Sequence, residues 1–158
     1  MSKQQSGFTL IELVVVIVIL GLLAATALPR FVNITGDARL ASVNGVAGGL
    51  RSAAALAKAQ YLVTGSSSAT SITVEGQTVN VLDTATFPNF GGRPDGTTSG
   101  MRRMLPDPSS FTMTPAGPGT QTGTITYTAN GGQAGCNVQY TPNAVGDPVT
   151  VNATTGNC

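Results

Sequence analysis

An apolar run near the N-terminus constrains this chain more than any other feature. Residues 8–28 read FTLIELVVVIVILGLLAATAL, and Glu12 is the one charged residue among them. As a helix that rises about 1.5 Å per residue, the run spans roughly 30 Å, the thickness of a bilayer's hydrocarbon core. The polar residues before it include Lys3, which favours a cytoplasmic N-terminus. We therefore expect the rest of the chain on the far side of a membrane.

Three kinds of N-terminus contain such a run: a cleaved signal peptide, a passive membrane anchor, and an anchor that is cut before its apolar run. Ala25-Thr26-Ala27 fits the small-x-small pattern of a signal peptidase site. Glu12 argues against the first two, because a carboxylate inside an apolar segment costs about 2.5–3.5 kcal/mol on insertion. Neither a discarded signal nor a passive anchor benefits from it, so Glu12 is predicted to be functional.

The composition argues against an enzyme. Histidine is absent, which removes the commonest catalytic base and the commonest metal ligand. Two cysteines do not make a four-thiolate zinc site. Eight basic and seven acidic residues give a net charge of +1, which argues against a broad nucleic-acid-binding face. We expect no catalytic residue, no cofactor and no metal.

Gly7-Phe8-Thr9-Leu10-Ile11-Glu12 closely resembles the prepilin processing motif of type IV pilins and pseudopilins. The resemblance implies that a membrane peptidase cuts between Gly7 and Phe8 and that Phe8 becomes the N-methylated terminus. The short leader and Phe8 resemble the type IVa subclass. Residues 29–33 (PRFVN) and 37–39 (DAR) look like the mannose-sensitive haemagglutinin (MSHA) pilins.

Glu12 lies four residues after the ammonium group that this cleavage would expose. Opposite charges attract strongly in a medium of low dielectric constant, whereas each charge alone incurs a desolvation penalty of several kcal/mol. We expect Glu12 to pair with the Phe8 ammonium of a neighbouring subunit in a filament. The alternative is a Glu12 that reaches the headgroups or pairs within its own chain.

The helix is predicted to continue to residue 63. Apolar or small residues recur every three or four positions and form one face. Pro29 is expected to kink or locally melt the segment before it, and Gly21 is a second weak point. Asp37 is a candidate N-cap for the second half of the helix. The members of the apolar face are Leu40, Val43, Ala47, Leu50, Ala54, Ala57 and Tyr61.

Beyond the helix, short alternating segments predict an antiparallel sheet. Residues 72–74 and 78–81 suggest a hairpin, and residues 124–128 and 136–140 flank an Asn130-Gly131 turn signal. Residues 149–151 are a candidate last strand. Residues 83–114 are rich in Pro, Gly and polar side chains, and we expect a surface loop there.

Two cysteines lie in the C-terminal part of the chain. In a translocated domain the pair Cys136 and Cys158 predicts a disulfide, which closes a loop worth roughly 3 kcal/mol in the chain-entropy model. In pilins the corresponding region is called the D-loop, a variable surface used in adhesion and subunit contact. A catalytic thiol pair is the competing hypothesis, and the CxxC spacing that would favour it is absent.

Two weaker signals are given no ligand. Residues 101–104 (MRRM) form a small basic patch, and Asp83, Asp95 and Asp107 lack the spacing of a calcium loop.

The predicted fold class is α+β, the type IV pilin fold: a long N-terminal helix, transmembrane in its first half, packed on a small antiparallel sheet. Its parts are a leader (1–7), a helix (8–63) with a transmembrane and assembly segment (8–28), and a β domain (64–158) with a D-loop (136–158).

The resemblance implies a structural subunit of a type IV pilus, polymerised through its N-terminal helix for surface adhesion. Its partners are other copies of itself, the prepilin peptidase and the assembly machinery. It would reside in the bacterial inner membrane as a precursor and then in an extracellular pilus, or fimbrium. The alternatives are a major pseudopilin of a type II secretion system and a membrane-anchored binding domain that never polymerises.

Overall fold

The computed structural model describes residues 8–105, 109–114, 120–132, 134–154 and 156–158, with the backbone alone for residues 28–33. The chain divides into two compact units, Met1–Thr35 and Gly36–Cys158. The predicted leader, residues 1–7, lies outside the described residues.

A single helix, α1 (Leu10–Thr64), runs through the positions where the sequence suggested weakness. The backbone is helical at both Gly21 and Pro29, so a kink or melting there stays a prediction about the fibre. Asp37 lies inside α1, and the expectation that it caps a second helical segment is wrong. The helix is continuous because a proline disturbs only the local hydrogen bond and leaves the rest of the ladder intact.

The first unit presents apolar side chains all around the helix. Leu10–Ala27 is long and apolar enough to cross a membrane, and none of it is buried within the molecule. A helix that is apolar all round must be covered by lipid or by other helices. This observation agrees with the expected transmembrane and assembly segment.

In the second unit, the predicted apolar face of the helix packs into the core. Val43, Ala47 and Leu50 are almost completely buried against the strands, and Leu40 is half-buried at the edge. Farther along, Ala57 and Tyr61 belong to a second cluster that packs against the first hairpin. The i, i+3, i+4 spacing therefore marks the face that the sheets cover.

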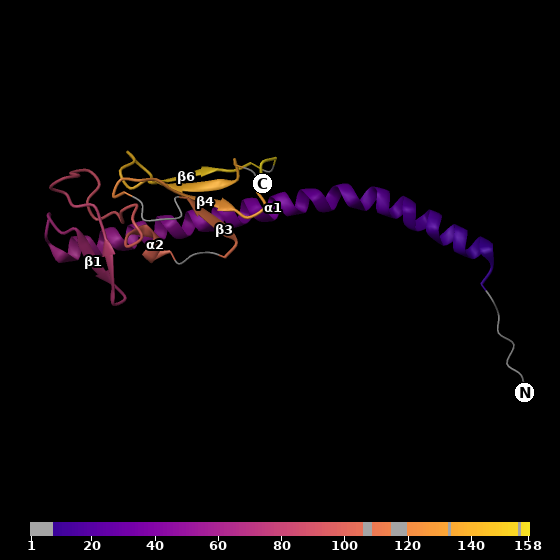
Figure 1. The fold of residues 1–158 in the computed structure, drawn as a ribbon, viewed down its shortest axis with the longest axis horizontal. Coiled ribbons are helices and arrows are strands. Elements are labelled where there is room, and N and C mark those ends of the chain that lie inside the picture. The colour runs from indigo at the N-terminus through magenta and orange to yellow at the C-terminus, as the bar shows by residue number, and fades with distance from the viewer. Residues whose placement is uncertain (1–7, 106–108, 115–119, 133, 155) are drawn as a thin grey trace, which may run out of the picture. The chain divides into compact units, whose positions relative to one another are not determined.

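Two antiparallel sheets make up the β part of this unit. The first is a hairpin of β1 (Ser71–Val74) and β2 (Gln77–Asn80), in which Val74 pairs with Gln77. The second has the order β3-β4-β5-β6, and Figure 1 shows it beside the C-terminal part of α1. Its strands are β3 (Phe111–Thr114), β4 (Ile125–Ala129), β5 (Asn137–Tyr140) and β6 (Val149–Asn152).

The prediction of a surface loop over residues 83–114 is wrong. The segment contains a short helix, α2 (Met101–Met104), and the strand β3. Met101 and Asp95 are completely buried. The Tyr140 hydroxyl donates to the carbonyl of Pro94 at 2.7 Å, and burial raises the pKa of Tyr140. Proline and glycine shape the path of the chain here, but side chains from β5 hold the segment in the core.

The remaining strand predictions are confirmed to within one or two residues. β4, β5 and β6 coincide with the segments expected at 124–128, 136–140 and 149–151, and Gly131 has a φ of 75° in the turn between β4 and β5. The α+β fold class is confirmed, with a long apolar N-terminal helix, antiparallel sheets and a C-terminal disulfide.

Candidate assembly site

Thr9 and Glu12 form a reciprocal cap at the start of α1. The Thr9 backbone N–H and hydroxyl both donate to Oε2 of Glu12, at 2.9 and 2.8 Å. The Glu12 N–H in turn lies 3.4 Å from the Thr9 hydroxyl oxygen that accepts from it. This is the capping box, in which a Thr before the helix and a Glu three residues later satisfy each other's backbone donors. The sequence pattern T-x-x-E predicts this capping box, but Thr9 was not among the predicted site residues.

The cap occupies only one of the two oxygens of the Glu12 carboxylate. Within the described residues Oε1 accepts no hydrogen bond. A carboxylate has about four lone-pair sites, so the second oxygen remains able to accept from another cation. Pairing within the chain and pairing between chains are therefore compatible at this residue.

The expected cleavage position lies between Gly7 and Phe8. Gly7 lies outside the described residues. Phe8 immediately precedes the cap, and its side chain is 92% exposed. Together with the exposed apolar side chains that follow it, Phe8 presents a surface that water does not favour. Lipid or neighbouring helices are the environments that suit this surface.

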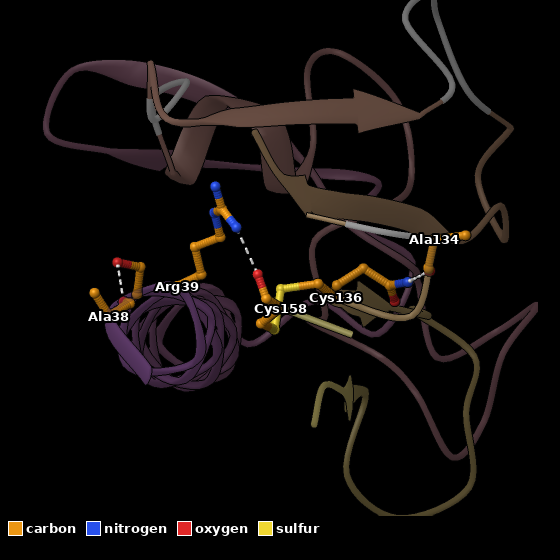
Figure 2. Close-up of a disulfide and its surroundings, with 7 residues drawn as sticks. Ala38, Arg39, Ala134, Cys136 and Cys158 are labelled. Carbon is orange, nitrogen blue, oxygen red and sulfur yellow. Dashed lines mark hydrogen bonds between the residues drawn. A yellow bond between two sulfur atoms is a disulfide. The ribbon is translucent and has the colours of Figure 1, made fainter. Parts of the chain in front are cut away.

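The second part of the candidate site is the loop closed by the disulfide. Cys136 and Cys158 are bonded, with their Cα atoms 5.0 Å apart. Figure 2 shows Arg39 reaching from α1 to the backbone oxygen of Cys158, an Nη1–O distance of 2.7 Å. Beside Cys136, the Asn137 side chain donates to the carbonyl of Ala134. The disulfide is thus anchored to the helix as well as to β5.

Arg93 organises the part of the loop between β5 and β6. Its guanidinium donates to the carbonyls of Pro142, Ala144 and Gly146 at 3.2, 2.7 and 2.8 Å. The same group stacks over the ring of Phe90, 5.3 Å from its centroid. A planar guanidinium with five donors suits a cluster of convergent carbonyls in a segment that has no ladder of its own.

Arg51 connects α1 to the end of the same loop. Its Nε lies 2.7 Å from Oδ2 of Asp147, and its Nη2 donates to the Val149 carbonyl at 3.3 Å. Partial burial raises the pKa of Asp147, but the Val149 N–H and the Arg51 guanidinium outweigh it, and the pKa lies below its usual value. Both side chains are nearly half exposed, so solvent screens this pair.

The N-terminal geometry coincides with a known motif. The family described as "Prokaryotic N-terminal methylation motif" matches residues 2–28. This range contains the expected cleavage position, the capping pair and the candidate membrane span.

The N-terminal region of the chain is similar to that of type IV pilins. It is 56% identical over 54 residues to the type IV narrow pilus major component PilA5 of Thermus thermophilus, which covers 34% of this chain and 47% of that protein. It is 47% identical over 53 residues to the type IV major pilin protein PilE1 of Neisseria gonorrhoeae, 34% of this chain and 32% of that protein. The type IV major fimbrial protein FimA of Dichelobacter nodosus is 42% identical over 53 residues, 34% of each chain.

These matches cover less than half of each of these relatives. No solved structure matches the chain. Glu12 lies in the first unit and the Cys136–Cys158 disulfide lies in the second. Glu12 and the disulfide were both predicted from the sequence. Thr9 and the loop contacts of Arg39 and Arg93 were not predicted. The two arginine contacts depend on partners that are distant in the chain.

The weaker signals of the sequence are structural where they are described. Asp83 caps a turn by accepting from the Thr86 N–H at 2.7 Å, and this backbone bond lowers its pKa. Asp95 accepts from the Thr97 hydroxyl inside the core. Asp107 lies outside the described residues, among which no group of three possible metal ligands occurs.

Proposed function

We propose that this chain is a structural subunit of a type IV pilus. In this proposal the precursor lies in the bacterial inner membrane, the prepilin peptidase cuts between Gly7 and Phe8, and the new Phe8 terminus is N-methylated. The mature chains then polymerise through their N-terminal helices into an extracellular fibre for surface adhesion. The N-terminal match and the relatives named above, which are named as pilus or fimbrial proteins and not as enzymes, support this.

The observation that carries the proposal is the first unit's combination of an unburied apolar helix with a single carboxylate at its start. Such a helix needs apolar neighbours, and the free oxygen of Glu12 needs a cation among them. A copy of the same chain supplies both, namely an equivalent helix and the ammonium of its own Phe8. In a passive membrane anchor the Glu12 carboxylate would have no function and no cation to pair with.

The proposed subtype is a major subunit most like the MSHA pilins, and it rests on the resemblance of residues 29–39. A major pseudopilin of a type II secretion system is the alternative, since pseudopilins share the processing motif. The disulfide-closed loop between Cys136 and Cys158 favours a pilin over that alternative.

Mass spectrometry of sheared and purified surface fibres tests the proposal. We expect an abundant chain that begins at N-methylated Phe8, lacks residues 1–7 and carries the Cys136–Cys158 disulfide. A mature chain that begins at Thr26 or Leu28 would instead establish an ordinary signal peptide. A correctly processed chain confined to the membrane fraction, in cells that shed fibres of another subunit, would establish a non-polymerising membrane protein.

A further inference from the structure

A basic cavity lies between α1 and the loop that follows β5. It has a volume of about 210 Å³ and contains three of the eight basic residues of the chain. Arg51, Lys58 and Arg93 contribute three positive charges and Asp147 one negative charge, so the formal charge of the lining is +2 (three minus one). The full lining is Arg51, Ala54, Ala55, Lys58, Arg93, Asp147 and Pro148.

The described part of the chain does not neutralise the positive charge of this cavity. The one acid, Asp147, is paired with Arg51. Arg93 is bound by backbone carbonyls, which orient its guanidinium and carry no net charge. Lys58 is exposed and forms no hydrogen bond or ion pair with any described residue. An anionic group is therefore the ligand that the cavity suits.

A single exposed acid stands at the tip of the hairpin formed by β1 and β2. Glu75 and Gly76 link the two strands, with φ angles of 49° and 77°. Two positive φ values define the type I′ turn, which favours Asn, Asp or Gly at its first central position. Glu75 thus suits the turn poorly, and its side chain bonds to no described residue. The turn requires the left-handed backbone at this position but does not require a carboxylate, which suggests a role for the Glu75 side chain outside the turn.

The cavity and the hairpin tip occupy opposite flanks of α1. At about 100° per residue, Arg51, Ala54, Ala55 and Lys58 fall within one arc of roughly 100° on the helix. Leu56, which lines a second hollow together with Glu75, lies roughly 150° from the middle of that arc. Glu75 therefore faces away from the cavity of its own chain. Two complementary surfaces on opposite sides of one molecule can form a head-to-tail contact, which builds an open helical assembly when the rotation between copies does not close into a ring.

We propose that the Glu75 carboxylate of one copy enters the Arg51–Lys58–Arg93 cavity of the next copy in the fibre. The inference rests on the proposed function and specifies a contact between globular units, in addition to the packing of the N-terminal helices. Lys58 is the residue that pairs with Glu75, because it alone of the three cations has no partner among the described residues. Because the contact is an ion pair near solvent, added salt weakens it.

Charge reversal in the full-length chain tests this contact in cells. The variants are Glu75→Lys, Lys58→Glu and the double variant, and the measurement is the ratio of sheared fibre to cleaved membrane pool. Each single reversal places like charges together, and we expect the ratio to fall about three- to tenfold. The double variant restores an opposite pair and should return the ratio to near the parent value.

Two control variants separate docking from folding. Glu75→Asn removes the charge and suits the type I′ turn, so it should leave thermal unfolding of the membrane pool unchanged or raise its midpoint while lowering fibre yield. Asp37→Asn removes an exposed acid elsewhere on α1 and should leave both measurements unchanged. Equal fibre yield from Glu75→Asn and the parent would overturn the proposal.

Zero-length cross-linking supplies an independent readout. Lys3 and Lys58 are the two lysines of the chain, so Lys58 is the single lysine left once residues 1–7 are removed. A carbodiimide should join its amine to the Glu75 carboxylate as an amide in intact fibres and not in the dispersed membrane pool. A Lys58 cross-link to Asp147 alone, in both samples, would overturn the proposal.

Failure of this contact is distinguishable from failure of the proposed function. Normal fibres from both single reversals, beside normal parent fibres, overturn the contact and leave the pilus subunit intact. Loss of fibres in Lys58→Glu with no rescue in the double variant shows that the cavity binds a different anion, which also overturns the contact. A parent chain absent from every fibre overturns the proposed function, and the contact with it.

Discussion

At the scale of single residues, we propose two uses for the one carboxylate of Glu12. Its Oε2 completes the cap with Thr9, and its Oε1 is open to a cation from a neighbouring chain. The cap is local and forms as soon as the helix starts. The cation is available only where a second processed chain lies alongside. Substitutions that separate these two uses show which one drives assembly.

Glu12→Ala should insert and be cleaved at least as well as the parent, because it removes a polar group from the apolar segment. In the proposed fibre the Phe8 ammonium would then be buried without its counter-ion, at a cost of about 3–5 kcal/mol per added subunit. We expect cleaved subunits to accumulate in the membrane while sheared fibre is lost, as measured by quantitative immunoblotting of the two fractions.

Glu12→Gln and Thr9→Ala are the matched controls for that result. Gln still completes the capping box but carries no charge, whereas Thr9→Ala weakens the cap by about 0.5–2 kcal/mol and keeps the carboxylate. If Glu12→Gln loses fibres and Thr9→Ala keeps them, the charge of Glu12 drives assembly. The opposite pattern, or full fibre yield from Glu12→Ala, would refute the ion-pair mechanism.

We expect Asp83 and Asp147 to make the second unit sensitive to acid. Both have a pKa below the usual value in the folded chain. Because the unfolded chain binds protons more tightly, their contribution to stability is complete above about pH 5 and is lost as the pH falls through the folded pKa values. The urea midpoint of the full chain in detergent should be lower at pH 3 than at pH 7.

Asp83→Asn tests the source of that pH dependence. The amide oxygen can still accept from the Thr86 N–H, but it does not titrate in this range. The variant should therefore lose less of its urea midpoint between pH 7 and pH 3 than the parent does. An identical loss in both chains would assign the acid sensitivity to other groups.

At the scale of elements, three interactions stabilise the loop between Cys136 and Cys158. The disulfide closes it, Arg39 holds its last residue, and Arg93 gathers the carbonyls between β5 and β6. The arginine contacts order the native loop, whereas the disulfide also limits the freedom of the unfolded chain. These contributions are therefore separable by experiment.

Cys158→Ser should lower the free energy of unfolding by about 3 kcal/mol, the chain-entropy value for a loop of this length. The irregular parts of the last twenty or so residues should also become sensitive to protease, because they lie outside β5 and β6. Thermal unfolding and limited proteolysis of the detergent-solubilised chain measure both effects. Reduction of the parent should reproduce them, and a parent that melts identically in reducing and oxidising buffer would contradict this account.

At the scale of the whole molecule, processing in the proposed pathway decides whether the first unit becomes available to neighbours. A small residue before the cleaved bond lets the peptidase approach the backbone closely. Gly7→Val should therefore leave a full-length precursor in the membrane with no fibre on the surface, as seen by immunoblotting and by electron microscopy of sheared material. The second unit should keep its normal urea midpoint, because it has its own core. A Gly7→Val chain that is cleaved as usual would disprove this cleavage position.

The sequence predicted the parts of this protein that depend on local pattern. The apolar run, the buried face that includes Val43 and Leu50, and strands β4 to β6 all follow from hydrophobic periodicity, which acts over a few residues. The cysteine pair was also predictable, because a translocated chain with two cysteines has one pairing available. The capping box was readable in the same way and was overlooked.

Contacts between residues far apart in the chain were beyond such patterns. Residues 83–114 have the composition of a loop, yet Asp95 and Met101 are buried because other segments cover them. The carbonyls of Pro142, Ala144 and Gly146 converge on Arg93 in the loop between the paired strands β5 and β6. The basic cavity likewise exists because the fold brings Arg93 and Asp147 to the flank of α1. Charge and burial at these positions depend on distances in space, and sequence spacing does not contain those distances.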